Sequence, residues 1–449
     1  MKEILFLAYH FPPIGGGGVQ RNRRFARYLP EFGYEPIVIS GPGTTDSRWT
    51  PTDSTLLEDG GPTVHRLPGP EPEGSSSWRE RAERWLGLRA PQLKWWLEGS
   101  FELTREVAQE TELIFASLIP YDTAESAARL SQELRKPWVA DLQDPWALDE
   151  MWVYPSWVHR SIDLRRMRKL LGTAEAIVMN TPESAAKLVG AFPELGRRIV
   201  VSITNGYDVS DFAGPRPERT DSTFRIVHTG SMHTARGERH RRTSPVKKIL
   251  GGTAEDVDIL TRSHVYLTEA IEQLFADEPE LAELVELHLA GVLSDSDRAV
   301  AAHQPAVKLL GYLPHAETIG LIRSADLLFL PMQDLRPGTL ASITPGKTYE
   351  YVASGRPILA AVPEGDAREL LEAVGTAHIC GPPDVQAMKR ILREQIDRFR
   401  RGEPAPPPDQ SVLARYERRS LTCDLAGIFD QILGIKAFVE PASSVGAQT

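Results

Sequence analysis

The chain has 449 residues, of which 41% are hydrophobic and 25% are charged, a balance typical of globular proteins and not of disordered ones. A chain of this length predicts two domains of about 200 residues each, because single cores stop growing near that size. The net charge of −10 gives no support to nucleic-acid binding, and no stretch reaches the ~18 apolar residues of a membrane span.

The compartment is indicated by two absences in the sequence. Cys380 and Cys423 are the only cysteines, too few for a disulfide framework or a zinc site. The apolar run at the N-terminus is too short for a secretory signal peptide. We therefore expect a cytoplasmic protein.

The N-terminal half begins as an α/β unit. Residues 2–9 predict a buried strand, a loop with four glycines at 15–18 follows, and residues 20–29 have helical periodicity. Glycines let the backbone come close to a ligand there, although a plain flexible turn is the alternative. Dinucleotide binding is disfavoured, because Arg21 replaces the third glycine of the G-x-G-x-x-G fingerprint and no acid ends the next strand, 35–40.

All nine tryptophans lie in the first 157 residues. One group falls within Trp78–Trp96, an amphipathic segment, and a second within Trp152–Lys169, which is also rich in arginine. Tryptophan beside basic residues suits the interface of a membrane with anionic lipid, here the inner face. Packing in the core or around an acceptor is an equally good interpretation.

Two carboxylates follow the predicted strand at 137–142. Asp141 and Asp144 stand at its carboxyl end, where Pro145 prevents a helix from continuing. At that edge of an open sheet a carboxylate pair is expected to point into a cleft. Each one alone is better explained as a helix cap or an Asx-turn.

The linker between the two halves is predicted at 208–222, a proline-rich polar segment after an N-terminal domain at 1–207. The second domain is expected at 223–410, and its first strand ends at Gly230. The basic segment 233–260 follows as an insertion.

This insertion is expected to be a mobile flap or a disordered, solvated loop, because it is charged and interrupts the α/β pattern. Arg262 stands where a helix resumes after it.

The most informative stretch runs from residue 344 to 359. A Pro345-Gly346 turn opens a short helical pattern that stops at a glycine, between predicted buried strands at 325–332 and 358–362. Lys347 places a cation in the first turn, and Glu350 shares its face. Backbone N–H groups and a lysine for phosphate, with a carboxylate for a sugar diol, suit a nucleotide. The alternative is an ordinary solvated Lys-Glu pair.

This stretch, P-G-K-x-x-E-Y-x-A-S-G-x-P, resembles the donor-nucleotide motif of GT-B glycosyltransferases, particularly the retaining enzymes of family 4. The loop P-P-x-G-G-G-G-V-Q-R, the element D-x-x-D-P-W from Asp141 and the element N-G-x-D-x-x-x-F from Asn205 resemble the same family. The resemblance implies an α/β protein with two Rossmann-like domains facing each other across a cleft. It also implies that a C-terminal helix, 411–433, crosses back to complete the N-terminal domain. The tail at 434–449 is expected to be disordered.

The resemblance further implies transfer of a sugar from a nucleoside-diphosphate sugar to an acceptor hydroxyl with retention, in polysaccharide or glycoconjugate synthesis. The acceptor would be a sugar, a lipid-linked molecule or a metabolite, and no metal or other cofactor is expected. Glu350 matches the second glutamate of the family's E-x7-E pattern, which binds the ribose, and Ser342 stands in place of the first. The donor contacts implied or inferred are Gly16, Gly17, Gly18, Gly230, Arg262, Pro345, Gly346, Lys347 and Glu350. The expected catalytic residues are Asp141, Asp144 and Lys347.

Two other functions fit the same residues. A nucleotide-sugar epimerase of the same fold would interconvert its donor without an acceptor. A non-catalytic sugar- or nucleotide-binding relative would bind weakly and hydrolyse nothing, and Ser342 would then mark lost activity.

Overall fold

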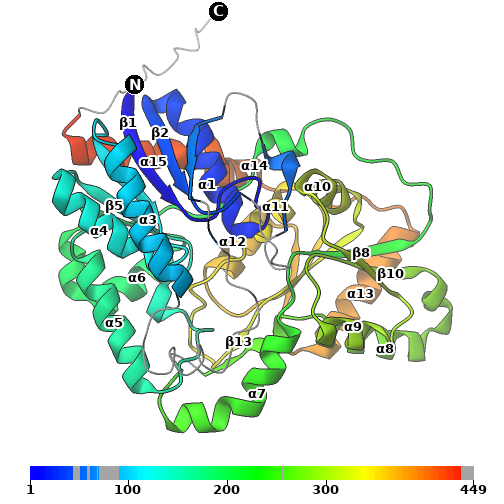
Figure 1. Cartoon of the computed structure of the whole chain (residues 1–449). Helices are drawn as coiled ribbons and strands as arrows, with labels where there is room; N and C mark the ends of the chain where they lie inside the picture. Colours follow the sequence, from blue (N-terminus) through cyan, green and yellow to red (C-terminus); the bar gives the residue numbers. More distant parts are fainter. Residues whose placement is uncertain (44–50, 58–60, 68, 70–90, 254–255, 436–449) are drawn as a thin grey trace, which may run out of the picture.

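The structure is a computed structural model that describes residues 1–43, 51–57, 61–67, 69, 91–253 and 256–435 (Figure 1). The predictions for Trp78, Trp85 and the tail at 436–449 therefore lie outside the described residues.

The first sheet has seven parallel strands in the order β3-β2-β1-β4-β5-β6-β7. Its inner strands β1, β4 and β5 are mostly apolar and buried apart from the first two residues of β1, as expected for a parallel sheet covered on both faces. The strands are β1 (Lys2–Ala8), β2 (Tyr34–Ser40), β3 (Thr63–Arg66), β4 (Leu113–Ser117), β5 (Trp138–Leu142), β6 (Ala176–Met179) and β7 (Ile199–Ser202). The helices are α1 (Gly17–Tyr28), α3 (Pro91–Val107), α4 (Thr123–Leu134), α5 (Trp157–Leu171) and α6 (Pro182–Ala191).

The second sheet has six parallel strands in the order β11-β10-β8-β12-β14-β15. Apolar clusters fill both of its faces. The strands are β8 (Phe224–Thr229), β10 (Val285–Ala290), β11 (Val307–Gly311), β12 (Leu327–Pro331), β14 (Ile358–Ala361) and β15 (Ala377–Cys380), and a separate antiparallel pair joins β9 (Val257–Asp258) to β13 (Asp334–Leu335). The helices are α7 (Thr234–Ile249), α8 (Val265–Asp277), α9 (Asp295–Ala301), α10 (His315–Ser324), α11 (Lys347–Ala353), α12 (Asp366–Val374) and α13 (Val385–Arg400).

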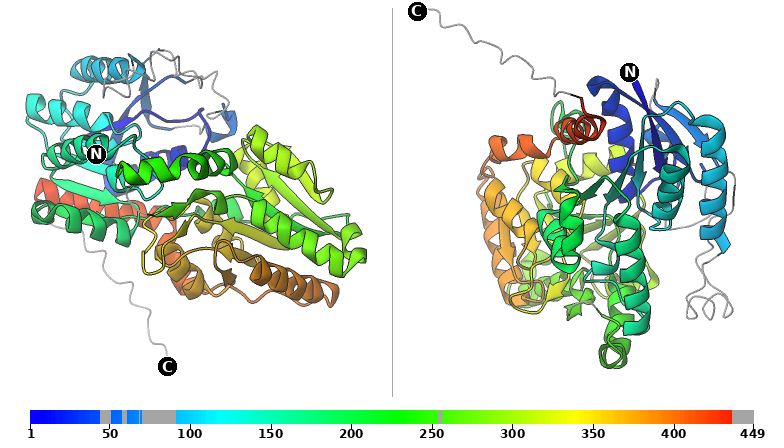
Figure 2. Two further views of the ribbon diagram at one scale, coloured as in Figure 1. Left: turned by 90° about the horizontal axis from the view of Figure 1, so that it is seen from below. Right: turned by 90° about the vertical axis from the view of Figure 1, so that its left-hand side faces the viewer.

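The chain returns to the first sheet at its end, through α14 (Gln410–Leu413) and α15 (Arg418–Leu433). In the right-hand view of Figure 2, α15 lies beside the N-terminal elements. Phe429 is fully buried, and its ring centroid lies 5.2 Å from that of Tyr34 and 5.8 Å from that of Phe115. The helix is therefore part of the first core, as predicted.

The basic segment 233–260 is not the disordered loop that its sequence suggested as one alternative. Most of it is the helix α7, which packs closely on the residues that follow it: a Cβ on Gly237 would lie 2.4 Å from Leu260 Cα. Arg236 also donates to the carbonyl oxygen of Met151 in the first domain (2.7 Å). Tertiary contacts thus stabilise this helix, although its many like charges favoured a solvated loop.

The tryptophans of the N-terminal half divide between the interior and the surface. Trp96 is fully buried, donates to Thr123 Oγ1 (2.9 Å) and contacts the ring of Tyr9, so it belongs to the core and not to a membrane interface. Trp152 and Trp157 are exposed. Within the described ranges, no helix is both long and apolar enough to cross a bilayer.

The packing of α15 gives a first prediction. Phe429→Ala leaves a cavity beside two aromatic rings and is expected to lower the free energy of unfolding by about 3–5 kcal/mol. Urea unfolding followed by tryptophan fluorescence measures the effect, because all nine tryptophans lie within residues 1–157. Gln431→Ala, on the exposed side of the same helix, is the control and should change stability by less than about 0.5 kcal/mol. Equal stability of the two variants would contradict the packing role of α15.

Candidate functional site

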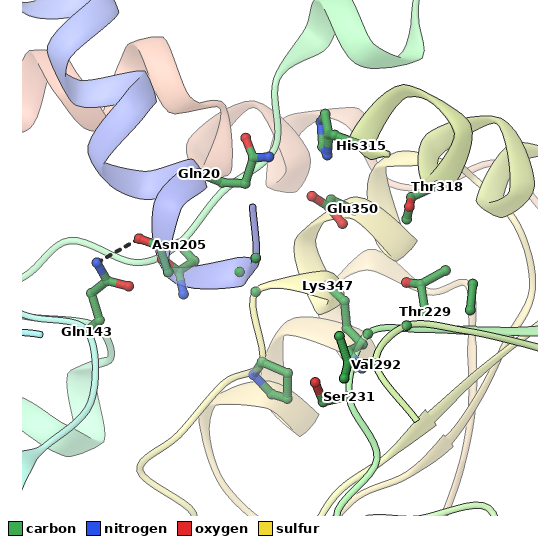
Figure 3. Close-up of a pocket in the computed structure, with 18 of the residues that line it drawn as sticks. Gln20, Gln143, Asn205, Thr229, Ser231, Val292, His315, Thr318, Lys347 and Glu350 are labelled. Carbon is green, nitrogen blue, oxygen red and sulfur yellow. Dashed lines mark hydrogen bonds between the residues drawn. The ribbon is translucent and has the colours of Figure 1, made fainter. Parts of the chain in front are cut away.

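A cavity of about 410 Å³ lies where the carboxyl ends of the two sheets face each other (Figure 3). The first sheet contributes loops that follow β1, β4, β5 and β6, and the second contributes loops after β8, β10 and β11 together with the start of α11. Ligands of open α/β sheets bind at this edge. The lining includes Gly16, Gly17, Gly18, Gln143, Asp144, Asn180, Asn205, Thr229, Gly230, Ser231, His233, Arg262, Tyr312, His315, Thr318, Pro345, Gly346, Lys347, Glu350 and Arg418.

All nine residues predicted to bind a donor, from the glycine loop to Glu350, line this cavity, and so does Asp144. Asp141 does not. The sequence prediction therefore selects one common place in the fold, with one exception.

Lys347 is a buried cation at the cavity wall. Its Nζ lies 2.9 Å from Nε2 of His228, whose Nδ1 lies 2.9 Å from the carbonyl oxygen of Phe329. Since that carbonyl can only accept, Nδ1 carries the proton and Nε2 accepts from the lysine. The pKa of Lys347 is lowered to about 7, mainly by burial and also by the Arg262 charge, while the Glu350 carboxylate opposes both effects. The amine is poised to regain full charge beside an anion.

Glu350 lies one turn after Lys347 on α11 but serves another part of the cavity. Figure 3 shows its carboxylate toward His315 and Thr318, whereas Lys347 lies near Thr229 and Ser231. Arg418 of α15 lines the cavity as well; burial lowers its pKa, and the nearby Glu350 carboxylate opposes the shift. One helix thus presents a cation and an anion to two regions of a single cavity.

Two glycine positions bring backbone to the wall. Gly16 has φ +114°, a conformation that other residues rarely adopt, and it is followed directly by α1. Gly230 has φ +90°, and a Cβ there would lie 3.0 Å from Lys347 Nζ. The Gly18 carbonyl accepts from the Gln143 amide (3.1 Å; dashed line in Figure 3). A side chain at Gly230 would fill the space beside the lysine.

Asp144 and Arg262 line the cavity from opposite domains and interact electrostatically. Burial raises the pKa of Asp144, and the Arg262 charge opposes this shift. Burial lowers the pKa of Arg262, and Asp144 opposes that shift in turn. Arg262 Nη1 donates to Gln333 Oε1 (3.3 Å). The pair places a carboxylate from the first domain and a guanidinium from the second on the same surface.

Asp141 was expected in the cleft, and the structure corrects this. Its side chain is fully buried, and Arg21 of α1 donates to it from Nη2 at 2.6 Å and from Nε at 3.1 Å. Asp141 lies within β5, where successive side chains point to opposite faces, and it points to the face that α1 covers. It therefore holds α1 on the sheet and cannot reach the cavity.

Glu150 is a residue that the sequence analysis missed. This fully buried carboxylate of the first domain accepts from Ser342 N (3.1 Å), from Ser342 Oγ and from Gln333 Nε2 (3.1 Å) in the second domain. Lys187 Nζ lies 3.7 Å away. Position 342, where the resembling family has a glutamate, thus contacts a carboxylate supplied by the other domain. A separation of 192 residues leaves no local signal for this contact.

Other residues of the site were detectable. Asn180, which lines the cavity, follows β6, and His228, which contacts Lys347, is the penultimate residue of β8, so both lie at the carboxyl ends of parallel strands. A search for polar residues at each predicted strand end would have found them. His233, next to α7, lies inside the segment that was set aside as an insertion.

No protein-family model matches the chain, and no curated protein sequence matches it. Solved structures do. HepE from Anabaena in complex with UDP-glucose has a TM-score of 0.59 at 17% identity, covering 96% of this chain and 100% of that one. Sucrose-phosphate synthase from Thermosynechococcus elongatus gives 0.61 at 13%, with 97% and 100% covered. A protein from Listeria monocytogenes described as a UDP-N-acetylglucosamine 2-epimerase gives 0.55 at 14%, with 97% and 98% covered.

At these identities the likeness establishes the fold. The chain has the GT-B architecture of two Rossmann-like domains with a C-terminal helix that returns to the first, which confirms the fold prediction.

The contact between Glu150 and Ser342 gives a second prediction. Ser342→Glu places a second carboxylate against a buried one and is expected to destabilise the protein by about 3–5 kcal/mol. Glu150→Gln keeps most hydrogen bonds and should have a smaller effect. The double variant should recover at least half of the loss from Ser342→Glu, because it restores one carboxylate and one neutral partner. Chemical denaturation of all four proteins measures this cycle, and additive effects would show that the two side chains do not interact.

Proposed function

We propose that the protein is a retaining glycosyltransferase that moves a sugar from a nucleoside-diphosphate sugar to an acceptor hydroxyl. The observation that carries this proposal is the placement of Lys347 and Glu350 on one helix, both lining a cavity that Arg262 and two glycine loops also line. A cationic region beside an anionic one matches a diphosphate next to a ribose diol. Similarity of residues 344–357 to the family 4 donor motif supports the same assignment.

The reaction would break the bond between the anomeric carbon and a phosphate oxygen. The electron pair of that bond leaves with the nucleoside diphosphate, and an acceptor hydroxyl oxygen forms the new bond to the anomeric carbon. The hydroxyl proton passes to the departing phosphate. Lys347 and Arg262 stabilise the negative charge that develops on the diphosphate, because they are fixed and poorly hydrated before the reaction begins.

Asp144 would orient the acceptor. Of the two aspartates expected to be catalytic, it is the one that lines the cavity, and it belongs to the first domain. Its raised pKa suits a hydrogen bond to a hydroxyl more than a permanent ion pair. We place the reaction in the cytoplasm, where nucleotide sugars are supplied, and its product in polysaccharide or glycoconjugate synthesis.

The fold itself does not distinguish a transferase from an epimerase, since both kinds of protein share it. Incubation of the protein with a bound nucleotide sugar, with and without candidate acceptors, separates the two. A transferase releases the diphosphate in proportion to glycosylated acceptor. Interconversion of the donor sugar without any acceptor would favour the epimerase, and binding without either reaction would favour a non-catalytic protein.

Substitution of Glu350 tests the donor site. A thermal-shift screen of UDP, GDP, ADP and TDP sugars first identifies the nucleotide. Glu350→Ala is then expected to weaken its binding by about 10- to 100-fold, because the ribose hydroxyls lose a charged acceptor. Glu372→Ala, at an exposed carboxylate of α12, is the matched control and should bind normally. Unchanged affinity and turnover in Glu350→Ala would refute the assignment.

The pKa of Lys347 predicts a pH dependence. A bound diphosphate favours the charged amine, so binding raises this pKa and takes up a proton above about pH 7. Nucleotide affinity is therefore expected to fall as the pH rises from about 7 to about 9, by at most about tenfold per unit. Calorimetry in buffers of different ionisation enthalpy measures the proton uptake. Lys347→Met should bind more weakly and lose the uptake; an uptake that persists in this variant would assign it elsewhere.

A further inference from the structure

Half of the exposed large apolar side chains among the described residues belong to two neighbouring segments. On α5 they are Trp157, with 61% of its surface exposed, and Val158 and Ile162. Around the end of α7 they are Val246, Ile249, with 86% exposed, and Leu250, and Trp152 adds a further ring. Single exposed apolar side chains need no explanation, but a cluster of this kind marks an interaction surface.

The backbone joins these segments into one surface. Trp157 N donates to the Leu250 carbonyl oxygen (2.7 Å), Tyr154 N donates to that of Gly252 (2.8 Å), and Val153 forms a β-bridge with Thr253. A Cβ on Gly251 would lie 3.0 Å from Trp157 Cβ, so the two segments are in close contact. In Figure 1, α7 and the start of α5 form the lower end of the molecule. We call the exposed apolar residues of this end the apolar tip.

Cations border the apolar tip. Val158, Ile162, Arg165 and Lys169 recur at the spacing of one face of α5, so apolar residues near the tip give way to basic ones along the helix. Arg165 and Lys169 have no ion pair or hydrogen bond with any described residue. The acidic neighbour on this helix, Asp163, accepts from Trp146 and Tyr154 and faces inward.

A basic groove of about 490 Å³ continues the same end of the molecule. Arg239, Arg242 and Lys247 of α7 line it together with Trp152. Neither Arg242 nor Lys247 is paired within the described part of the chain. Among the α7 neighbours, Lys248 is neutralised by Asp256 and Arg241 by Asp258. The cations that line the groove thus stand out in a protein whose net charge is −10.

We propose that the apolar tip and its bordering cations dock on a bilayer that contains anionic phospholipid. Tryptophan and aliphatic side chains enter the headgroup region while arginine and lysine contact the lipid phosphates, the combination that interfacial protein surfaces use. A second copy of the chain fits less well: a two-fold interface brings the same patch against itself, and the unpaired cations would then face their own copies. The charge pattern therefore selects an anionic partner that also has an apolar interior.

Vesicle flotation with the full chain tests this proposal and needs no turnover, so its outcome is independent of the proposed enzymatic activity. The protein is expected to float with vesicles of phosphatidylcholine and phosphatidylglycerol, to remain unbound with phosphatidylcholine alone, and to dissociate as salt rises. Soluble glycerophosphate at the same ionic strength should not displace it, because it offers the charge without the apolar layer.

Two variants separate the apolar and electrostatic contributions. Trp157→Ala/Ile162→Ser/Ile249→Ser changes exposed side chains only and should lower partitioning at least about tenfold. Arg165→Glu/Lys169→Glu should lower it by about fivefold or more per charge. Matched controls are Leu310→Ser on β11 and Arg390→Glu/Arg400→Glu on α13, which lie on other elements and should bind as the wild type does.

The proposal is overturned if the wild type does not float with anionic vesicles, or if both tip variants float as well as it does. Sedimentation equilibrium tests whether the surface binds a second copy of the chain instead. A dimer that the tip variants abolish, without vesicle binding by the wild type, would assign the surface to a second copy of the chain.

Discussion

The buried amine of Lys347 is the constraint on which the rest of the site depends. A lysine at the wall of a cavity is tolerated only with a partner, and the partner here is a neutral imidazole nitrogen of His228, which accepts a hydrogen bond without supplying charge. The Arg262 charge repels the charged amine of Lys347, and the Glu350 carboxylate offsets part of this repulsion. The cavity is thus short of negative charge on the side of Lys347. An anion of the size of a diphosphate relieves this shortage, whereas a neutral sugar does not.

Local features of the site could be predicted from the sequence, because each depended on residues close together in the chain. The glycines at 15–18 and the stretch from Pro345 to Glu350 lie where a strand meets a helix, and the parallel topology fixes that edge as the cavity wall. Asp141 and Asp144 show that a shift of three residues along the chain decides whether a side chain reaches the cavity. Three residues apart, one is inside the strand and points to α1, and the other is past its end and lines the cavity.

The features that could not be predicted depend on contacts between distant segments. Glu150 and Ser342 meet across the domain boundary, and neither residue has a neighbour in sequence that signals the other. The helix α7 contains glycine, proline and several like charges, so its local preference argues against a helix. Its packing on Leu260, the hydrogen bond of Arg236 to Met151 and the bonds that the following residues 250–252 make with residues 154–157 outweigh that preference. Tertiary structure decides both cases.

The attachment of residues 153–157 to residues 250–253 has a mechanical consequence. The polypeptide passes from the first domain to the second along 208–222. It returns to the first domain near Tyr207, whose carbonyl oxygen accepts from Arg418 N (2.9 Å). With the strip of backbone hydrogen bonds beside α7, the two halves are fastened at more than one place. The linker is therefore not the only connection between the domains: residues 250–253 tie the second domain to the first at a point far from 208–222. Movement of one half relative to the other is restrained at both ends of the interface, not only where the chain crosses.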